Sequence, residues 1–192
     1  MKALTLWPEW SWAIDLPKPD GTGYHPLAKR VENRTWKIPL GIWFALHAGR
    51  HIGGRPGRAS SDDGCESVAF MGQRAGFDAH ALADYRDGGA VILSPFIGSW
   101  GVATQLWPGS THVQRPIITS AILGLFRVTR YVLPGESDES DGVRGWKVPD
   151  QIGNVFEYAR LREPVPCKGA QGLWEVPPDI LNKCREIGTE QP

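Results

Sequence analysis

The sequence predicts an α+β fold, a small mixed β-barrel with peripheral helices and one long insertion. Three observations support this prediction. Short apolar strand candidates recur along the chain, a helix candidate stands between the first two, and a long polar stretch precedes the strongest later strand. With 192 residues, of which 41% are apolar, the chain suits a single domain over residues 1–192 with its own core.

The strand candidates are runs of apolar, β-branched and aromatic residues, bounded mainly by Pro, Gly or polar turn residues. The longest of them contains Gly124, which we expect to mark a bend or a bulge. The central run, with apolar residues in succession, is expected to be buried on both faces and to place Trp43 in the core. The predicted strands are Ala3–Trp7, Val31–Trp36, Gly41–Ala48, Ala121–Leu133 and Val155–Arg162.

Helices are predicted at both ends of the chain. At Glu9–Leu16, Trp10 and Ile14 are four residues apart and share one helix face. Pro177–Ile187 has prolines at its start and glycine after its end, the usual helix boundaries. A further helical turn is expected over Leu27–Arg30.

Residues 49–115 are predicted to be an insertion on one side of the barrel. The stretch is polar and rich in Gly, Arg and Ser at its start, and it ends in short extended pieces. Between these parts its apolar residues form partial helical stripes. Its predicted elements are a loop at Gly49–Gly64 and helices at Cys65–Phe77 and Asp78–Arg86.

The charge distribution bears on possible partners. Lys plus Arg and Asp plus Glu are 21 each, so the chain lacks the excess positive charge of a nonspecific duplex binder. Residues 1–60, however, carry nine basic against four acidic side chains, and residues 61–141 carry five against ten. If the chain binds nucleic acid, its first third supplies the attraction.

The cysteines and the N-terminus predict a cytoplasmic protein. Cys65, Cys167 and Cys184 are odd in number and widely spaced, which fits neither a disulfide framework nor a metal site. The chain has no signal-peptide pattern and no apolar run of about 20 residues, so no membrane association is expected. His47 and His51 fall on a strand and the following loop, so we predict no metal and no cofactor.

A charged strand is the most informative stretch. With the two-residue period of a strand, Glu32, Arg34 and Trp36 share one face of Val31–Trp36, and Lys29 lies just before it. A carboxylate, a guanidinium and an indole make a poor core but suit a polar cleft with an aromatic wall. The alternative is a solvated strand edge with an ion pair, worth about 0–1 kcal/mol.

Four motifs, in order, resemble the ASCH domain of the PUA-like superfamily. They extend from residue 3 to residue 174, and together they are more specific than any one of them alone. The motifs are Ala3-Leu-Thr-Leu-Trp-Pro-Glu-Trp10, Lys29-Arg-Val-Glu-Asn-Arg-Thr-Trp36, Ala45-Leu-His-Ala-Gly49 and Pro166-Cys-Lys-Gly-Ala-Gln-Gly-Leu-Trp174.

The resemblance implies a PUA-like barrel with a cleft that faces RNA. The resemblance also implies a possible reaction, because some small members of the family hydrolyse an acylated cytidine. In those members the Lys is a catalytic residue and a Thr three residues later is the nucleophile. Lys29 matches the Lys, but Glu32 occupies the position of the Thr. A carboxylate can serve as a base toward water, which is different chemistry.

The residues of the predicted cleft suit a nucleobase and its phosphate. Indoles stack on bases, a carboxylate accepts from an exocyclic amine, and cations bind phosphate. Each Trp is alternatively a core residue, and Lys168 alternatively lies in a solvated turn. The predicted ligand-binding residues are Trp10, Lys29, Glu32, Arg34, Trp36, His47, Lys168, Gly169 and Trp174.

Two functions follow as hypotheses, beside the alternative of a protein-interaction domain that uses exposed Trp residues. The first is a binding module for RNA, single-stranded nucleic acid or a modified nucleoside. The second is a hydrolase that acts on an acylated cytidine-type nucleoside or on nucleic acid, with Lys29 and Glu32 as its catalytic residues. Glu32 would hold Lys29 protonated and suited to stabilise an oxyanion, since opposite charges about 4 Å apart attract by about 4 kcal/mol at a dielectric of about 20.

Overall fold

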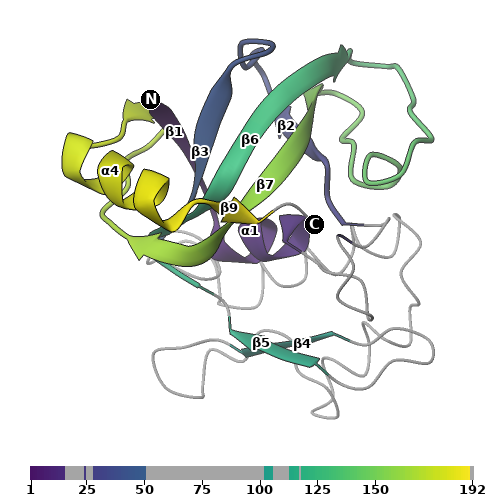
Figure 1. Cartoon of the computed structure of the whole chain (residues 1–192). Helices are drawn as coiled ribbons and strands as arrows, with labels where there is room; N and C mark the ends of the chain where they lie inside the picture. The colour runs from purple at the N-terminus through teal and green to yellow at the C-terminus, as the bar shows by residue number, and fades with distance from the viewer. Residues whose placement is uncertain (16–23, 25–27, 51–101, 106–112, 117, 191–192) are drawn as a thin grey trace, which may run out of the picture.

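A computed structural model describes residues 1–15, 24, 28–50, 102–105, 113–116 and 118–190 (Figure 1). Its centre is a mixed sheet of seven strands that curls into a half-barrel, in agreement with the predicted α+β class. The strands of this sheet are β1 (Lys2–Leu6), β2 (Val31–Arg34), β3 (Trp43–Ala48), β6 (Ala121–Val132), β7 (Ile152–Pro166), β8 (Leu173–Glu175) and β9 (Thr189–Glu190).

The strand order is β2-β7-β6-β3-β1-β8, and β9 pairs with β7. All these pairs are antiparallel except β1 with β3, which run parallel with Thr5 opposite His47. Parallel neighbours need a crossover connection, and here the chain between them forms helix α1 (Pro8–Ile14) and β2. Both parallel strands therefore end at the same edge of the sheet.

The long strand β7 pairs with three other strands, β2, β6 and β9. Its first residues pair with β2, and Arg160 and Leu161 pair with β9. Against β6 its register shifts twice, between Ile122 and Gly124 and again between Val128 and Arg130. The first shift ends at Gly124 and confirms the irregularity predicted there. Such shifts let a long pair of strands bend.

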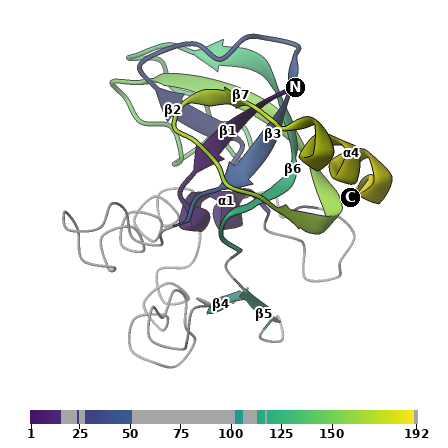
Figure 2. The same cartoon turned by 90° about the vertical axis from the view of Figure 1, so that its left-hand side faces the viewer.

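Apolar side chains pack on both faces of the curled sheet. The concave interior holds a cluster that includes Leu4, Phe44, Phe126 and Phe156. On the outer face, helix α4 (Pro178–Ile187) packs over alternate residues such as Ala3 and Ala45, so successive residues of β1 and β3 serve different layers (Figure 2). None of the described helices is long and apolar enough to cross a membrane.

Most predicted elements are present with shifted ends. The charged strand stops at Arg34 and not at Trp36, and the last long strand runs on to Pro166. The helical turn predicted over Leu27–Arg30 is wrong for its described residues, which form a bend and an extended entry to β2. Trp43 is also not a core residue: it is half-buried, with the Arg127 guanidinium 4.9 Å from its ring centroid.

The predicted insertion falls mostly outside the described residues, as do both helices expected within it. Of its described parts, β4 (Val102–Gln105) and β5 (Val113–Pro116) pair with each other in a separate two-stranded sheet. The segment leaves the main sheet after Ala48 and returns at Ala121, two residues that pair across β3 and β6. The Ser120 amide also donates to the Gly49 carbonyl at 3.0 Å, so the two ends of this segment are hydrogen-bonded to each other.

We predict that Gly124→Ala destabilises the half-barrel by about 1–3 kcal/mol, the usual range for overpacking. A Cβ at this position would lie 2.4 Å from Tyr158 Cε2 and 2.5 Å from the Ala159 carbonyl oxygen. Denaturant unfolding measures the change. The control is Gly135→Asn, where a Cβ would meet nothing within 4 Å and Asn tolerates the φ of +83°. Equal stability of the two variants would contradict the close packing at the bulge.

Candidate functional site

A cavity of about 930 Å³ opens at the edge of the sheet where β1 and β3 end. Among the described residues, four segments and Ser120, just before β6, line it. The segments are the end of β1 with the start of α1, the charged strand β2, the end of β3, and the glycine turn at residues 167–172 between β7 and β8. The charged strand and the glycine turn are more than 130 residues apart in sequence, and both contribute side chains to this cavity.

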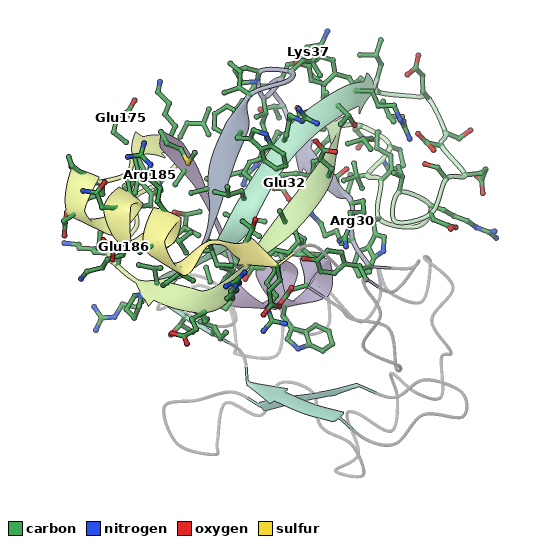
Figure 3. All side chains as sticks on the ribbon, in the orientation of Figure 1. Arg30, Glu32, Lys37, Glu175, Arg185 and Glu186 are labelled. Atoms are coloured by element: carbon green, nitrogen blue, oxygen red, sulfur yellow. The ribbon has the colours of Figure 1, made fainter. Side chains whose placement is uncertain are left out.

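The β2 side of the cavity carries a buried ion-pair chain. Lys29 Nζ donates to Glu32 Oε2 at 2.6 Å, and Arg34 Nε lies 2.9 Å from Glu32 Oε1. The second contact is an ion pair without hydrogen-bond alignment. The side chains of Lys29, Glu32 and Arg34 are 3%, 11% and 32% exposed, so burial decreases from Lys29 to Arg34. Figure 3 shows Glu32 within the curled sheet and Lys37 at the periphery.

Burial shifts the pKa of Lys29. Removal of its ammonium from water lowers the pKa of Lys29 below its ordinary value, and the carboxylate of Glu32 opposes this shift only in part. The sequence argument for a protonated Lys29 rests on the attraction of Glu32 alone, and the structure adds the opposing desolvation of the ammonium. A lysine with a lowered pKa exchanges a proton more readily than a solvated one.

A second hydrogen-bonded group lies between β1, β3 and the glycine turn. Thr5 Oγ1 is 3.2 Å from His47 Nδ1, and His47 Nε2 is 3.1 Å from the carbonyl oxygen of Cys167. The indole of Trp174, on β8, donates to Thr5 Oγ1 at 3.0 Å. Its ring also meets His47 edge-on, with centroids 5.5 Å apart.

Gly169 permits this contact. A Cβ on Gly169 would lie 2.3 Å from His47 Cε1 and 2.9 Å from Thr5 Oγ1, so only glycine lets the turn approach the two side chains. Burial lowers the pKa of His47 below its ordinary value, although the hydrogen bond to the Cys167 carbonyl opposes that shift. His47 is therefore neutral near pH 7.

Among the described lining residues, two carry an indole ring, Trp7 and Trp10. Trp10, on α1, has Lys29 Nζ 5.6 Å from its ring centroid and packs edge-on against the buried Trp146. Trp7, just before the helix, is 46% exposed, so much of its ring is accessible to a ligand. The cavity thus offers a ligand two rings, Trp10 packed against Trp146 and Trp7 largely exposed.

The structure brings most of the predicted residues together. Lys29 and Trp174 are in the layer directly behind the lining, where they contact Glu32 and Thr5. Trp36 follows the end of β2, is 37% exposed and is not among the lining residues. The predicted residues that line the cavity are Trp10, Glu32, Arg34, His47, Lys168 and Gly169.

Thr5, Trp7 and Arg50 are among the lining residues that the sequence did not predict as site residues. From the sequence alone, Thr5 belongs to a buried strand, Trp7 to the end of that strand, and Arg50 to the loop after β3. Pairing of Thr5 with His47 is the signal that was missed, and it depends on two parallel strands 42 residues apart. Within the described part of the chain, no three His, Cys, Asp or Glu side chains come together as a metal site requires.

Comparison of the sequence with models of known protein families finds no match, and comparison with curated proteins finds none either.

We predict that Glu32→Gln destabilises the protein by about 3–5 kcal/mol, because it leaves the buried Lys29 without a countercharge. The pKa of Lys29 should fall further, and less stability should be lost at a pH high enough to deprotonate it. Denaturant unfolding at several pH values measures both effects.

The matched control is Glu157→Gln, which removes the carboxylate of the half-exposed pair with Arg127. Its expected effect is about 0–1 kcal/mol. If the two variants lose the same stability, Lys29 and Glu32 do not form the buried pair described above.

Proposed function

We propose that the protein is a PUA-like domain of the ASCH type that binds RNA, or a single modified nucleobase, in this cavity. The observation that supports the proposal best is the joint lining of one cavity by the charged strand and the glycine turn, with Trp7 and Trp10 beside them. The resemblance of the four motifs supports the same fold and function. The proposal retains the cytoplasmic setting expected from the cysteines.

The polar lining suits the edge of a base. Each carboxylate oxygen of Glu32 has one near cation, Lys29 on one side and Arg34 on the other, and each oxygen keeps a further lone pair for an exocyclic amine. Arg34, one-third exposed, has guanidinium hydrogens that can donate to a base carbonyl. A base stacked on Trp7 or Trp10 gains about 1–3 kcal/mol.

Positive charge prevails among the described lining residues. Arg34, Arg50 and Lys168 face one lining carboxylate, that of Glu32. Arg50 and Lys168 are exposed, as phosphate-binding cations must be. A phosphate beside the base therefore adds to affinity, which favours a nucleotide or a single strand over a bare nucleoside. The local excess also explains how a chain of zero net charge can bind a polyanion.

We expect Arg34→Ala and Lys168→Ala each to weaken binding of a labelled single-stranded RNA, the first through loss of a donor to the base and the second through loss of a phosphate contact. Lys168→Ala should also lower the salt dependence of affinity by about one phosphate contact. Trp7→Ala should weaken binding by about 5- to 150-fold through lost stacking. Fluorescence anisotropy at several salt concentrations measures these changes.

Two control variants fit the same titration. Arg144→Ala removes a cation, 67% exposed, that does not line the cavity, and Trp36→Ala removes an exposed indole outside the lining. Neither should change affinity. The proposal fails if single-stranded RNA does not bind at low salt, or if the control variants weaken binding as much as the cavity variants.

Hydrolysis is the second candidate function, and the buried contact of Lys29 with Glu32 favours it. A carboxylate on the cavity wall, hydrogen-bonded to a lysine with a lowered pKa, is a suitable general base for a water molecule. Lys29 is not itself among the lining residues, so its role is to position and charge Glu32. An acylated cytidine-type nucleoside is the substrate class that the resemblance implies.

The test is incubation with N4-acetylcytidine, followed by chromatography for cytidine and acetate. Turnover should drop about 10²- to 10⁴-fold in Glu32→Gln, the range for loss of a general base, and persist in Glu157→Gln. Absence of product from the unmodified protein would remove this substrate. Equal turnover in both variants would remove Glu32 as the base.

A further inference from the structure

We infer that Thr5 and His47 form a nucleophile–base pair that accepts an acyl group from a substrate in the cavity. This inference deepens the hydrolase candidate and rests on it for the substrate class. It assigns the covalent step to the hydroxyl of Thr5, and not to the position of the family's nucleophilic Thr, which Glu32 occupies in this chain. Both residues are lining residues of the cavity, so the pair meets the same space as Glu32 and Arg34.

The hydrogen-bond partners settle the direction of each bond. The carbonyl oxygen of Cys167 can only accept, so His47 Nε2 carries the hydrogen of the neutral ring and donates it. His47 Nδ1 is then an acceptor. The indole nitrogen of Trp174 can only donate, so Thr5 Oγ1 accepts from it. The hydroxyl hydrogen of Thr5 consequently points to His47 Nδ1, over a distance of 3.2 Å.

This arrangement has the three roles of a hydrolytic triad. A hydroxyl donates to an imidazole, and a third group fixes the ring and its tautomer. Here the third group is a backbone carbonyl, which accepts from Nε2 and stabilises the imidazolium that forms when Nδ1 takes a proton. The Trp174 hydrogen bond occupies one lone pair of Thr5 Oγ1, and the second remains for attack.

The sheet holds the pair in place. Thr5 and His47 are opposite each other across the parallel strands β1 and β3, so their side chains project side by side from one face. His47 is 1% exposed and Thr5 is half-buried, so the base is shielded from water by the protein while the hydroxyl reaches the cavity. Neighbours on rigid strands lose little entropy when they react.

Each step of the reaction balances. Thr5 Oγ1 bonds to the acyl carbon while its proton moves to His47 Nδ1, and the tetrahedral intermediate then expels the amine or alcohol, which takes that proton from Nδ1. The acyl group is now an ester of Thr5. Water attacks the ester with His47 as base, the carboxylic acid departs, and the proton returns to Thr5 Oγ1.

The test uses the full chain and p-nitrophenyl acetate as acyl donor. We expect a burst of p-nitrophenol of about one equivalent per protein molecule, the pattern of an accumulating acyl intermediate. Peptide mass mapping after acid quench should locate the acetyl group on Thr5. Thr5→Ser should keep the burst, and Thr5→Val should lose it. The matched control is Thr129→Val, at an exposed threonine outside the cavity lining.

His47→Gln should slow acylation by about 10²- to 10⁴-fold, the loss expected for a general base. In the unmodified protein the acylation rate should rise with pH as His47 loses its proton, with a midpoint below the ordinary histidine value of 6.5, because burial lowers the pKa of His47. A group that only fastened the glycine turn would alter stability without producing this pH profile.

Acetyl groups found only on lysines, or an undiminished burst in folded Thr5→Val, would overturn the inference. If Thr5→Val does not fold, the mass map of the unmodified protein and the Thr5→Ser burst still decide it. RNA binding and turnover of N4-acetylcytidine are separate measurements. Turnover without an acetyl on Thr5 would retain the hydrolase with Glu32 and water, and RNA binding without acylation would retain the binding module alone.

Discussion

The close approach of the glycine turn to β1 and β3 is the constraint on which the cavity depends. Gly169 rests against His47 and Thr5, at distances that no side chain fits, and the hydrogen bonds of His47 to Cys167 and of Trp174 to Thr5 hold it there. Without this approach the turn would not face β2, and the lysine at residue 168 would not share a hollow with Glu32. Backbone shape, more than charge, brings the polar groups together.

The site divides its charges by depth. The lysine–glutamate pair is buried at the wall, whereas Arg34 is one-third exposed and Arg50 and Lys168 are exposed. A buried pair contributes little net stability but fixes the carboxylate in one orientation. The outer cations keep most of their hydration and remain available to a ligand. Precise recognition and long-range attraction are thus assigned to different residues.

Sequence patterns predicted the strands β1, β2, β3, β6 and β7 and the helices α1 and α4, because alternation and helix boundaries are local signals, but they did not predict the short strands β8 and β9. The common cavity of two distant motifs was expected from the family resemblance. Sequence patterns placed Trp36 wrongly on a strand face, since the strand ends at Arg34 before the alternation reaches it. They also could not show Thr5 as a functional residue. A threonine in a strand resembles any other β-branched residue until its parallel partner is known, and that pairing is a property of the whole sheet.

The joined ends of the segment between β3 and β6 have a consequence for how this fold can diversify. Ala48 and Ala121 pair directly across β3 and β6, so the pairing in the sheet does not depend on how many residues connect them. The entropic cost of closing a longer loop also rises only slowly with its length. Gly49, Arg50 and Ser120 also border the cavity. Lengthening or exchanging this connection therefore offers evolution, or a protein engineer, a way to alter ligand choice while the scaffold stays the same.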